Sequence, residues 1–162
     1  MASTLDVIAS RRSCRSFTST PVPRDVIEKI VQAGAEAPCA MGRYPWTFTV
    51  VNNPETLARV NQETKKQTYG APCVIFVGVN NGIPGYELFD AALACENICI
   101  AAQSLGLGSI ILSYHYPTDV TPAVNTICGK PADHKICMGV AIGTANGPVH
   151  AHTHPAPNVT FH

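Results

Sequence analysis

Charged residues are scarce in this sequence. Lysine, arginine, aspartate and glutamate make up 14% of its 162 residues, against about 25% in ordinary soluble domains, while 46% of the residues are apolar. The formal net charge is zero, which argues against a nucleic-acid surface. A domain with so few charges would leave apolar surface in water, and a subunit interface, most often that of a homodimer, would cover it.

Long apolar runs and a secretory leader are missing too. No segment reaches the roughly 18 uninterrupted apolar residues of a membrane-spanning helix, and polar residues break up any signal-peptide pattern from Ser3 onward. The seven cysteines include no CxxC pair, and an odd number without a secretory signal indicates free thiols in a reducing compartment. We therefore expect one cytoplasmic domain over residues 1–162, with neither a membrane nor nucleic acid among its partners.

The standard phosphate-binding sequences are also absent. There is no GxxxxGK[ST] motif, and the one Gly-x-Gly, at 106–108, follows a helical pattern and precedes a strand pattern. A dinucleotide fingerprint needs the opposite order, strand and then helix. We find no Ser/His/Asp or paired-carboxylate constellation either. Any bound phosphate would therefore be held mainly by side chains.

Helical and strand patterns alternate along the chain. The sequence predicts helices over 4–10, 24–35, 54–66, 86–105 and 120–128. It predicts strands over 45–51, 71–80, 109–113 and 136–142. Thr4 is the expected cap of the first helix, and residues 144–162 form an extended tail rich in Gly, Pro and His. This order of elements predicts an α+β or α/β sandwich with about four strands.

Three of the 11 basic residues fall together in the stretch RRSCRSF, residues 11–17. Arginine is used where a planar anion needs several donors in fixed geometry, and phosphate is the usual case. Arg11, Arg12 and Arg15 are therefore candidate phosphate ligands, with the Ser13 hydroxyl as a further donor. The alternative is an exposed turn in which Arg11 and Arg12 cap the dipole of the preceding helix.

Histidines alternate in the C-terminal tail at positions 150, 152 and 154. In an extended segment this spacing places three imidazoles on one face, as a metal site would need. Two other interpretations stay open. The histidines can stand in for basic residues beside a phosphate, or the tail is simply solvated.

Several stretches taken together resemble one known family. RRSCRSF at 11–17, AEAPCAMGRYPWTFTVV at 35–51 and DAALACENICIAAQSLGLGS at 90–109 occur in an order and spacing similar to those of the nitroreductase family of FMN-dependent oxidoreductases. The resemblance runs from residue 4 to about residue 145. It implies a nitroreductase-like sandwich whose central, mostly antiparallel sheet is flanked by helices. It also implies an intertwined homodimer with one FMN in each of two interface clefts.

The resemblance implies roles for particular residues. The FMN phosphate and ribityl chain would be bound by Arg11, Ser13 and Arg15; Arg12 lies in the same motif, but adjacent side chains diverge. A stretch of the partner subunit would line the isoalloxazine ring with Pro38, Cys39, Ala40 and Gly42. The segment after the third strand would reach the flavin N5 with Ser113 and Tyr114.

The sequence departs from the family pattern at several of these positions. Gly42 and Tyr44 stand where many relatives have Asn and Gln that contact the flavin. The tail has no Lys or Arg after Lys135, so His152 and His154 are the candidates for the missing basic contacts. Cys39 replaces a hydroxyl residue, either as an isosteric exchange or as a thiol beside the ring.

The implied activity is electron transfer through FMN, with no metal ion. NAD(P)H would deliver hydride and leave, and a nitroaromatic or quinone-type acceptor would then take the electrons in a ping-pong reaction. The alternative is a flavin-binding carrier without turnover. The short segment over 81–86, which leaves little room for a substrate lid, favours that alternative, as do the lost Asn and Gln and the unusual tail.

Overall fold

The computed structural model of the chain describes residues 3–113, 120–131, 133–149 and 153–162. The helices are α1 (Thr4–Ser10), α2 (Arg24–Ala35), α3 (Pro54–Glu63), α4 (Glu87–Ser104) and α5 (Val120–Ile127). The strands are β1 (Trp46–Val51), β2 (Cys73–Val79), β3 (Gly108–Leu112) and β4 (Ile136–Gly143). Every predicted helix and strand is present, and one further element, the 3-10 turn η1 (Ala40–Gly42), was not predicted.

Two helix ends differ from the prediction for physical reasons. The cap of α1 is Ser3 and not Thr4, because the Ser3 hydroxyl accepts a hydrogen bond from the Asp6 N–H at 3.2 Å. The Asp6 carboxylate in turn accepts from the Ser3 N–H at 3.0 Å, which completes a capping box. The pKa of Asp6 is lowered first by the hydrogen bond that its carboxylate accepts from the Ser3 hydroxyl at 2.7 Å, and second by the bond from the Ser3 N–H. The helix α3 ends at Glu63, since Lys65 and Lys66 adopt left-handed backbone conformations with φ of 51° and 65°.

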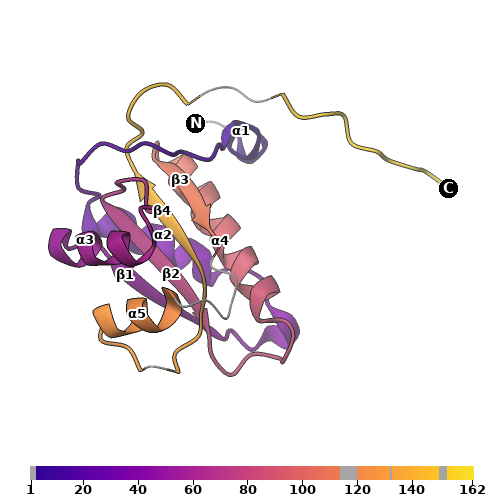
Figure 1. Ribbon diagram of the computed structural model, residues 1–162. Coiled ribbons are helices and arrows are strands. Elements are labelled where there is room, and N and C mark those ends of the chain that lie inside the picture. Colours follow the sequence, from indigo (N-terminus) through magenta and orange to yellow (C-terminus); the bar gives the residue numbers. More distant parts are fainter. Residues whose placement is uncertain (1–2, 114–119, 132, 150–152) are drawn as a thin grey trace.

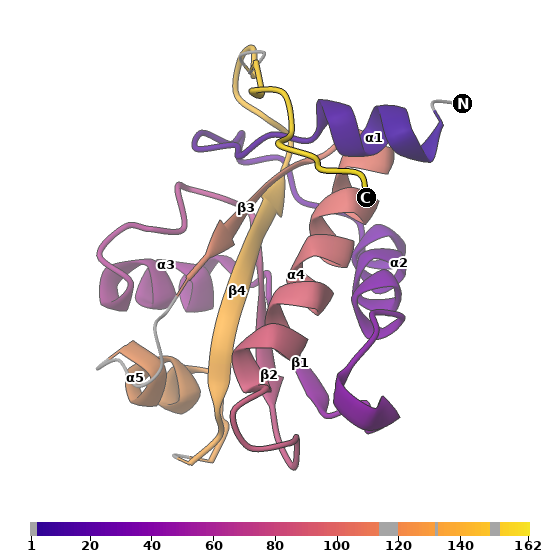
Figure 2. The same cartoon turned by 90° about the vertical axis from the view of Figure 1, so that its right-hand side faces the viewer.

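The four strands form one sheet in the order β1-β2-β4-β3, and every pairing is antiparallel. The predicted α+β sandwich is therefore confirmed. Helices α2 and α4 cover one face of the sheet, and α3 and α5 cover the other (Figure 1) (Figure 2). The strand β2 lies inside the sheet and all seven of its residues are buried, because both of its faces are covered by helices.

Each face of the sheet has its own apolar cluster. On one face, residues of β2 and β4 such as Ile75 and Val140 pack with Ile30 of α2 and Ile98 of α4. On the other face, the buried residues include Phe76 together with Val60 of α3 and Val124 of α5. None of the described helices combines the length and the apolar character needed to cross a membrane.

A polar network ties the segment before β4 to β1 and β2. The imidazole of His134 lies with Nε2 3.2 Å from the Thr47 hydroxyl and with Nδ1 3.4 Å from the Asn80 amide nitrogen. The Asn125 amide donates to the His134 carbonyl at 2.7 Å. Since the Asn80 amide nitrogen is a donor, Nδ1 has to accept, which requires a neutral ring. Burial, and after it the charge of Lys130, lower the pKa of His134.

This network predicts a loss of stability on acidification. Because the folded state lowers the pKa of His134, the unfolded chain takes up the proton at a higher pH than the folded one does. The contribution of His134 is therefore complete above about pH 6.5 and is lost as the pH falls through that value toward the lower folded pKa. Urea unfolding between about pH 5 and 7.5 should show this slope in the wild type and a weaker slope in His134→Gln. The exposed control His162→Gln should keep the wild-type slope, and equal slopes in all three proteins would contradict the assignment.

Candidate functional site

The arginine-rich segment runs along the free edge of β3. Its Cys14 N–H donates to the Ser109 carbonyl at 2.8 Å, and an isolated bridge pairs Ser13 with Ser109. A second bridge pairs Phe17 with Ala145, just beyond β4. In this extended segment Cys14 is buried while Ser13 and Arg15 are exposed, because alternate side chains point to opposite sides.

A cleft of about 540 Å³ opens along this segment. It brings the N-terminal arginines together with the start of the C-terminal tail, which is more than a hundred positions away in the sequence. Its lining has two parts, the arginine-rich segment with the four predicted phosphate-binding residues and the start of the tail with one predicted histidine. The lining residues are Arg11, Arg12, Ser13, Cys14, Arg15, Ser16, Ala145, Asn146, Gly147, Pro148, Val149 and His154. His152 and Tyr114 lie outside the described residues.

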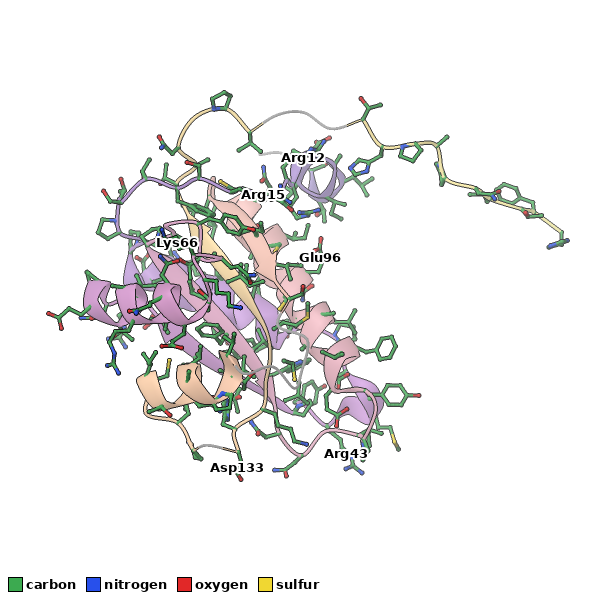
Figure 3. All side chains as sticks on the ribbon, viewed as in Figure 1. Arg12, Arg15, Arg43, Lys66, Glu96 and Asp133 are labelled. Carbon is green, nitrogen blue, oxygen red and sulfur yellow. The ribbon has the colours of Figure 1, made fainter. Side chains whose placement is uncertain are left out.

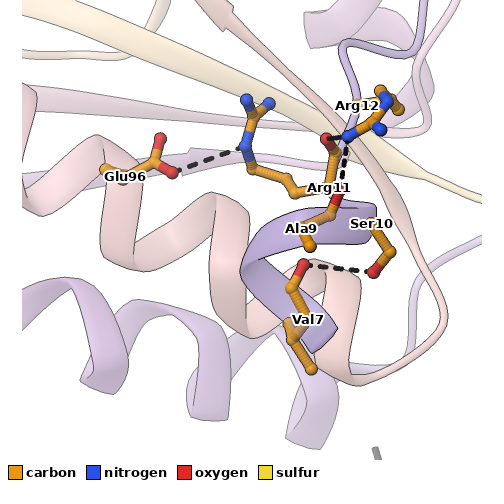
Figure 4. Close-up of polar contacts among 6 residues, drawn as sticks. All are labelled: Val7, Ala9, Ser10, Arg11, Arg12 and Glu96. Carbon is orange, nitrogen blue, oxygen red and sulfur yellow. Dashed lines mark hydrogen bonds and ion pairs between the residues drawn. The ribbon is translucent and has the colours of Figure 1, made fainter. Parts of the chain in front are cut away.

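The three arginines have different environments. Arg12 donates from Nη1 to the carbonyls of Ala9, at 2.7 Å, and Arg11, at 2.6 Å (Figure 4). Arg12 therefore caps the C-terminal end of α1, as the alternative interpretation expected. Arg11 forms an ion pair through Nε with Glu96 of α4 at 3.4 Å. Arg15 is exposed at the cleft, so it is the arginine best placed to meet a ligand.

The predicted ring-lining residues lie far from these arginines. Pro38, Cys39, Ala40 and Gly42 belong to the segment that joins α2 to β1. Figure 3 shows Arg43 of this segment at the opposite end of the body from Arg12 and Arg15. Ser113, which is exposed, follows β3 four residues beyond Ser109, or ~13 Å along a strand. Within one chain the predicted site is thus divided into two halves.

Asp90 is a site residue that the sequence reasoning missed. Its side chain lies in the first turns of α4 and only 2% of the residue is exposed. Its Oδ1 accepts a hydrogen bond from the Ala40 N–H at 2.9 Å, whereas Oδ2 has no partner among the described residues. A buried acceptor left unpaired costs about 1–3 kcal/mol or more. In the sequence Asp90 is one of three carboxylates of α4, beside Glu87 and Glu96, and no local pattern distinguishes it from the other two.

The cysteines offer no reactive cluster. All seven are free, and five of them are buried. Burial raises the pKa of Cys73 to about 12 and that of Cys99 to about 11, so these thiols stay protonated and inert. Cys39 is half-buried, and its Sγ accepts a hydrogen bond from the Tyr44 N–H at 3.1 Å. Among the described residues, no group of three His, Cys, Asp or Glu side chains is arranged to hold a metal.

Comparison with known proteins gives one consistent family. A sequence model of the nitroreductase family matches residues 8–69 and 61–144. The chain is 37% identical over 144 residues to a protein of Methanothermobacter thermautotrophicus that is provisionally named NADH dehydrogenase/NAD(P)H nitroreductase, and the match covers 84% of this chain and 73% of that protein.

Solved structures agree with the sequence matches. A nitroreductase with bound FMN from Desulfitobacterium hafniense has a TM-score of 0.85 and 27% identity, over 99% of this chain and 98% of that one. A nitroreductase with bound FMN from Bacteroides fragilis has a TM-score of 0.84 and 26% identity, over 99% of both chains. The two similarities extend over nearly the full length of the compared chains.

Proposed function

The chain belongs to the nitroreductase family, and from this premise we propose that it is an FMN-dependent oxidoreductase that passes electrons from NAD(P)H to a small aromatic acceptor. The observation that carries the proposal is the cleft in which Arg11, Ser13 and Arg15 meet the tail residue His154. These side chains supply guanidinium, hydroxyl and imidazole donors, which suit a phosphate group. The donor set therefore fits the phosphate end of FMN.

The flavin ring requires a second copy of the chain. The predicted ring-lining residues Pro38, Cys39, Ala40 and Gly42 lie at the other end of the protomer, so a second copy has to bring them to the cleft. Exposed apolar side chains on α1 and α4 offer the surface for it, namely Leu5, Ile8, Leu88, Phe89 and Leu93. The tail leaves the body (Figure 1) with Val159 and Phe161 exposed, as suits a segment that crosses to a partner. We therefore propose a homodimer.

The chain's own residues bind and orient the reactants. Bound FMN supplies the two-electron chemistry. Arg15 and Ser13 would hold the phosphate, and Ser113 and Tyr114, the latter outside the described residues, would provide backbone to the ring. NAD(P)H and then a nitroaromatic or quinone-type acceptor would bind in turn at this site. No side chain has to act as a nucleophile or general base, and the free thiols suit a reducing cytoplasm.

The proposed activity predicts a yellow protein that turns over. FMN should be released on denaturation at about one per chain. With menadione or a nitrofuran as acceptor, the purified protein should oxidise NADH or NADPH in the steady state. Parallel lines in double-reciprocal plots would support successive occupation of one site. Bound FMN without turnover would instead identify a flavin carrier.

Arg15 is predicted to hold the phosphate. A charge-assisted hydrogen bond contributes ~1.5–3 kcal/mol, so Arg15→Ala should weaken FMN binding roughly 10- to 150-fold. Riboflavin, which lacks the phosphate, should bind the variant and the wild type alike. The matched control is Arg24→Ala, since Arg24 is an exposed arginine on α2 that is paired with Glu28. Equal losses for FMN and riboflavin would show that Arg15 has a structural role only.

The homodimer is tested by mass and by one interface variant. Equilibrium sedimentation at micromolar concentration should give about twice the chain mass of 17.2 kDa. Leu93→Glu places a charge on the exposed apolar face of α4 and should favour the monomer. The control Gln62→Glu adds the same charge to an exposed position of α3 and should leave the dimer intact. A wild-type monomer that binds FMN would overturn the composite site.

A further inference from the structure

The ring-lining segment between α2 and β1 has an unusual backbone. Met41 and Tyr44 have φ of 54° and 50°, and Gly42 has φ of 62°. Side chains other than glycine adopt this left-handed region at a cost, and such conformations persist only where surrounding contacts enforce them. Met41 and Tyr44 are themselves exposed. Within the segment the Tyr44 N–H donates to the Cys39 Sγ, and further contacts hold the segment to the fold beneath it.

Two of these contacts come from a single residue, Asp90. Its Oδ1 accepts from the Ala40 N–H at 2.9 Å, at the start of the bend. Its backbone carbonyl accepts from the Trp46 indole N–H at 3.0 Å, where β1 begins. Asp90 thus holds the segment at both ends, from the first turns of a long, well-packed helix. We infer that Asp90 is a positioning residue that sets the backbone of the segment proposed to line the flavin ring.

Stability alone does not account for a carboxylate at this position. Its Oδ2 is buried and has no partner among the described residues, which costs stability. An apolar side chain would avoid that cost but would leave the Ala40 N–H without its acceptor. Asn97 lies about two turns after Asp90 on the same helix, and its side-chain hydrogen bond has a different role. Its amide donates to the Ala33 carbonyl of α2 at 2.9 Å, a contact that joins two helices and does not involve the ring-lining segment.

The Asp90 side chain acts on the proposed ring-lining segment and not on the arginine cleft. The part of the inference that concerns the flavin rests on the proposed function. Losing the Asp90 side-chain contact would free Ala40 and its neighbour Cys39, both proposed to lie at the ring. The arginines are held separately, at the edge of β3. The variant should therefore change the environment of the ring and leave the phosphate contacts in place.

The first test uses the protein without flavin. Trp46 is the only tryptophan, so its fluorescence reports the anchored end of the segment directly. Asp90→Ala keeps the backbone carbonyl that accepts from Trp46 but releases Ala40, so the loosened segment should uncover the Trp46 ring and roughly double the acrylamide quenching constant. Asp90→Asn keeps an acceptor oxygen for the Ala40 N–H and should behave as the wild type does. The matched control Asn97→Ala removes a side-chain hydrogen bond from the same helix and should leave quenching unchanged.

A second measurement decides the question even where Asp90→Ala does not fold. In the wild-type protein the Ala40 amide should exchange with deuterium at least about tenfold more slowly than the amide of its exposed neighbour Met41, because it is bonded to a buried carboxylate. Equal exchange of the two amides would overturn the inference. Equal quenching in Asp90→Ala and Asn97→Ala would overturn it as well.

A third measurement concerns the loaded protein. Asp90→Ala should shift the midpoint potential and the absorption maximum of bound FMN, and Asn97→Ala should shift neither. Asp90→Asn should restore both values. Unchanged values in a folded Asp90→Ala would overturn the role toward the ring. A protein that binds no FMN would refute the proposed function, and the first two measurements would still decide whether Asp90 anchors the segment.

Discussion

Both faces of a narrow sheet have to be covered, and the rest of the structure follows from that constraint. All seven residues of β2 are buried, so helices must pack on each side of the sheet. The inner face of α4 supplies much of one layer through buried residues such as Ala94, Ile98 and Ala102. Its outer face keeps Phe89 and Leu93 exposed. The apolar residues that make charge scarce therefore occupy two places: the inner face of α4 packs in the core, and the outer face is the one proposed to meet a second copy.

The free edge of β3 explains why the cleft needs no glycine-rich loop. An edge strand has backbone groups without a neighbouring strand, and one of them, the Ser109 carbonyl, accepts the Cys14 N–H. That pairing extends the arginine segment, so the Cys14 side chain turns into the core while Ser13 and Arg15 turn outward. Together with the backbone bonds that join Ser16 and Thr18 to the residues after β4, this pairing makes the arginine-rich stretch one wall of the cleft.

Much of this arrangement could be predicted, because its signals are local. Prolines, the change from helical to alternating period, and the apolar run over 71–80 placed the elements of the fold. The arginine stretch lines the cleft, although the sequence did not distinguish Arg12, which caps α1, from the exposed Arg15. Asp90 was missed because its partners Ala40 and Trp46 lie 50 and 44 positions away. Contacts of that range depend on the packing of α4 and leave no local pattern.

The division of the site between the two ends of the protomer has a thermodynamic consequence in the proposed homodimer. A ligand that touches the arginine cleft of one copy and the segment over 38–42 of the other binds the dimer more tightly than it binds either monomer. By linkage, FMN must then strengthen the dimer by the same factor by which dimerisation strengthens FMN binding. Because Asp90 fixes the shape of that segment before any ligand arrives, it lowers the ordering cost of both events. In the proposed homodimer, cofactor binding, subunit association and the rigidity of one short bend would thus be coupled through a single buried carboxylate.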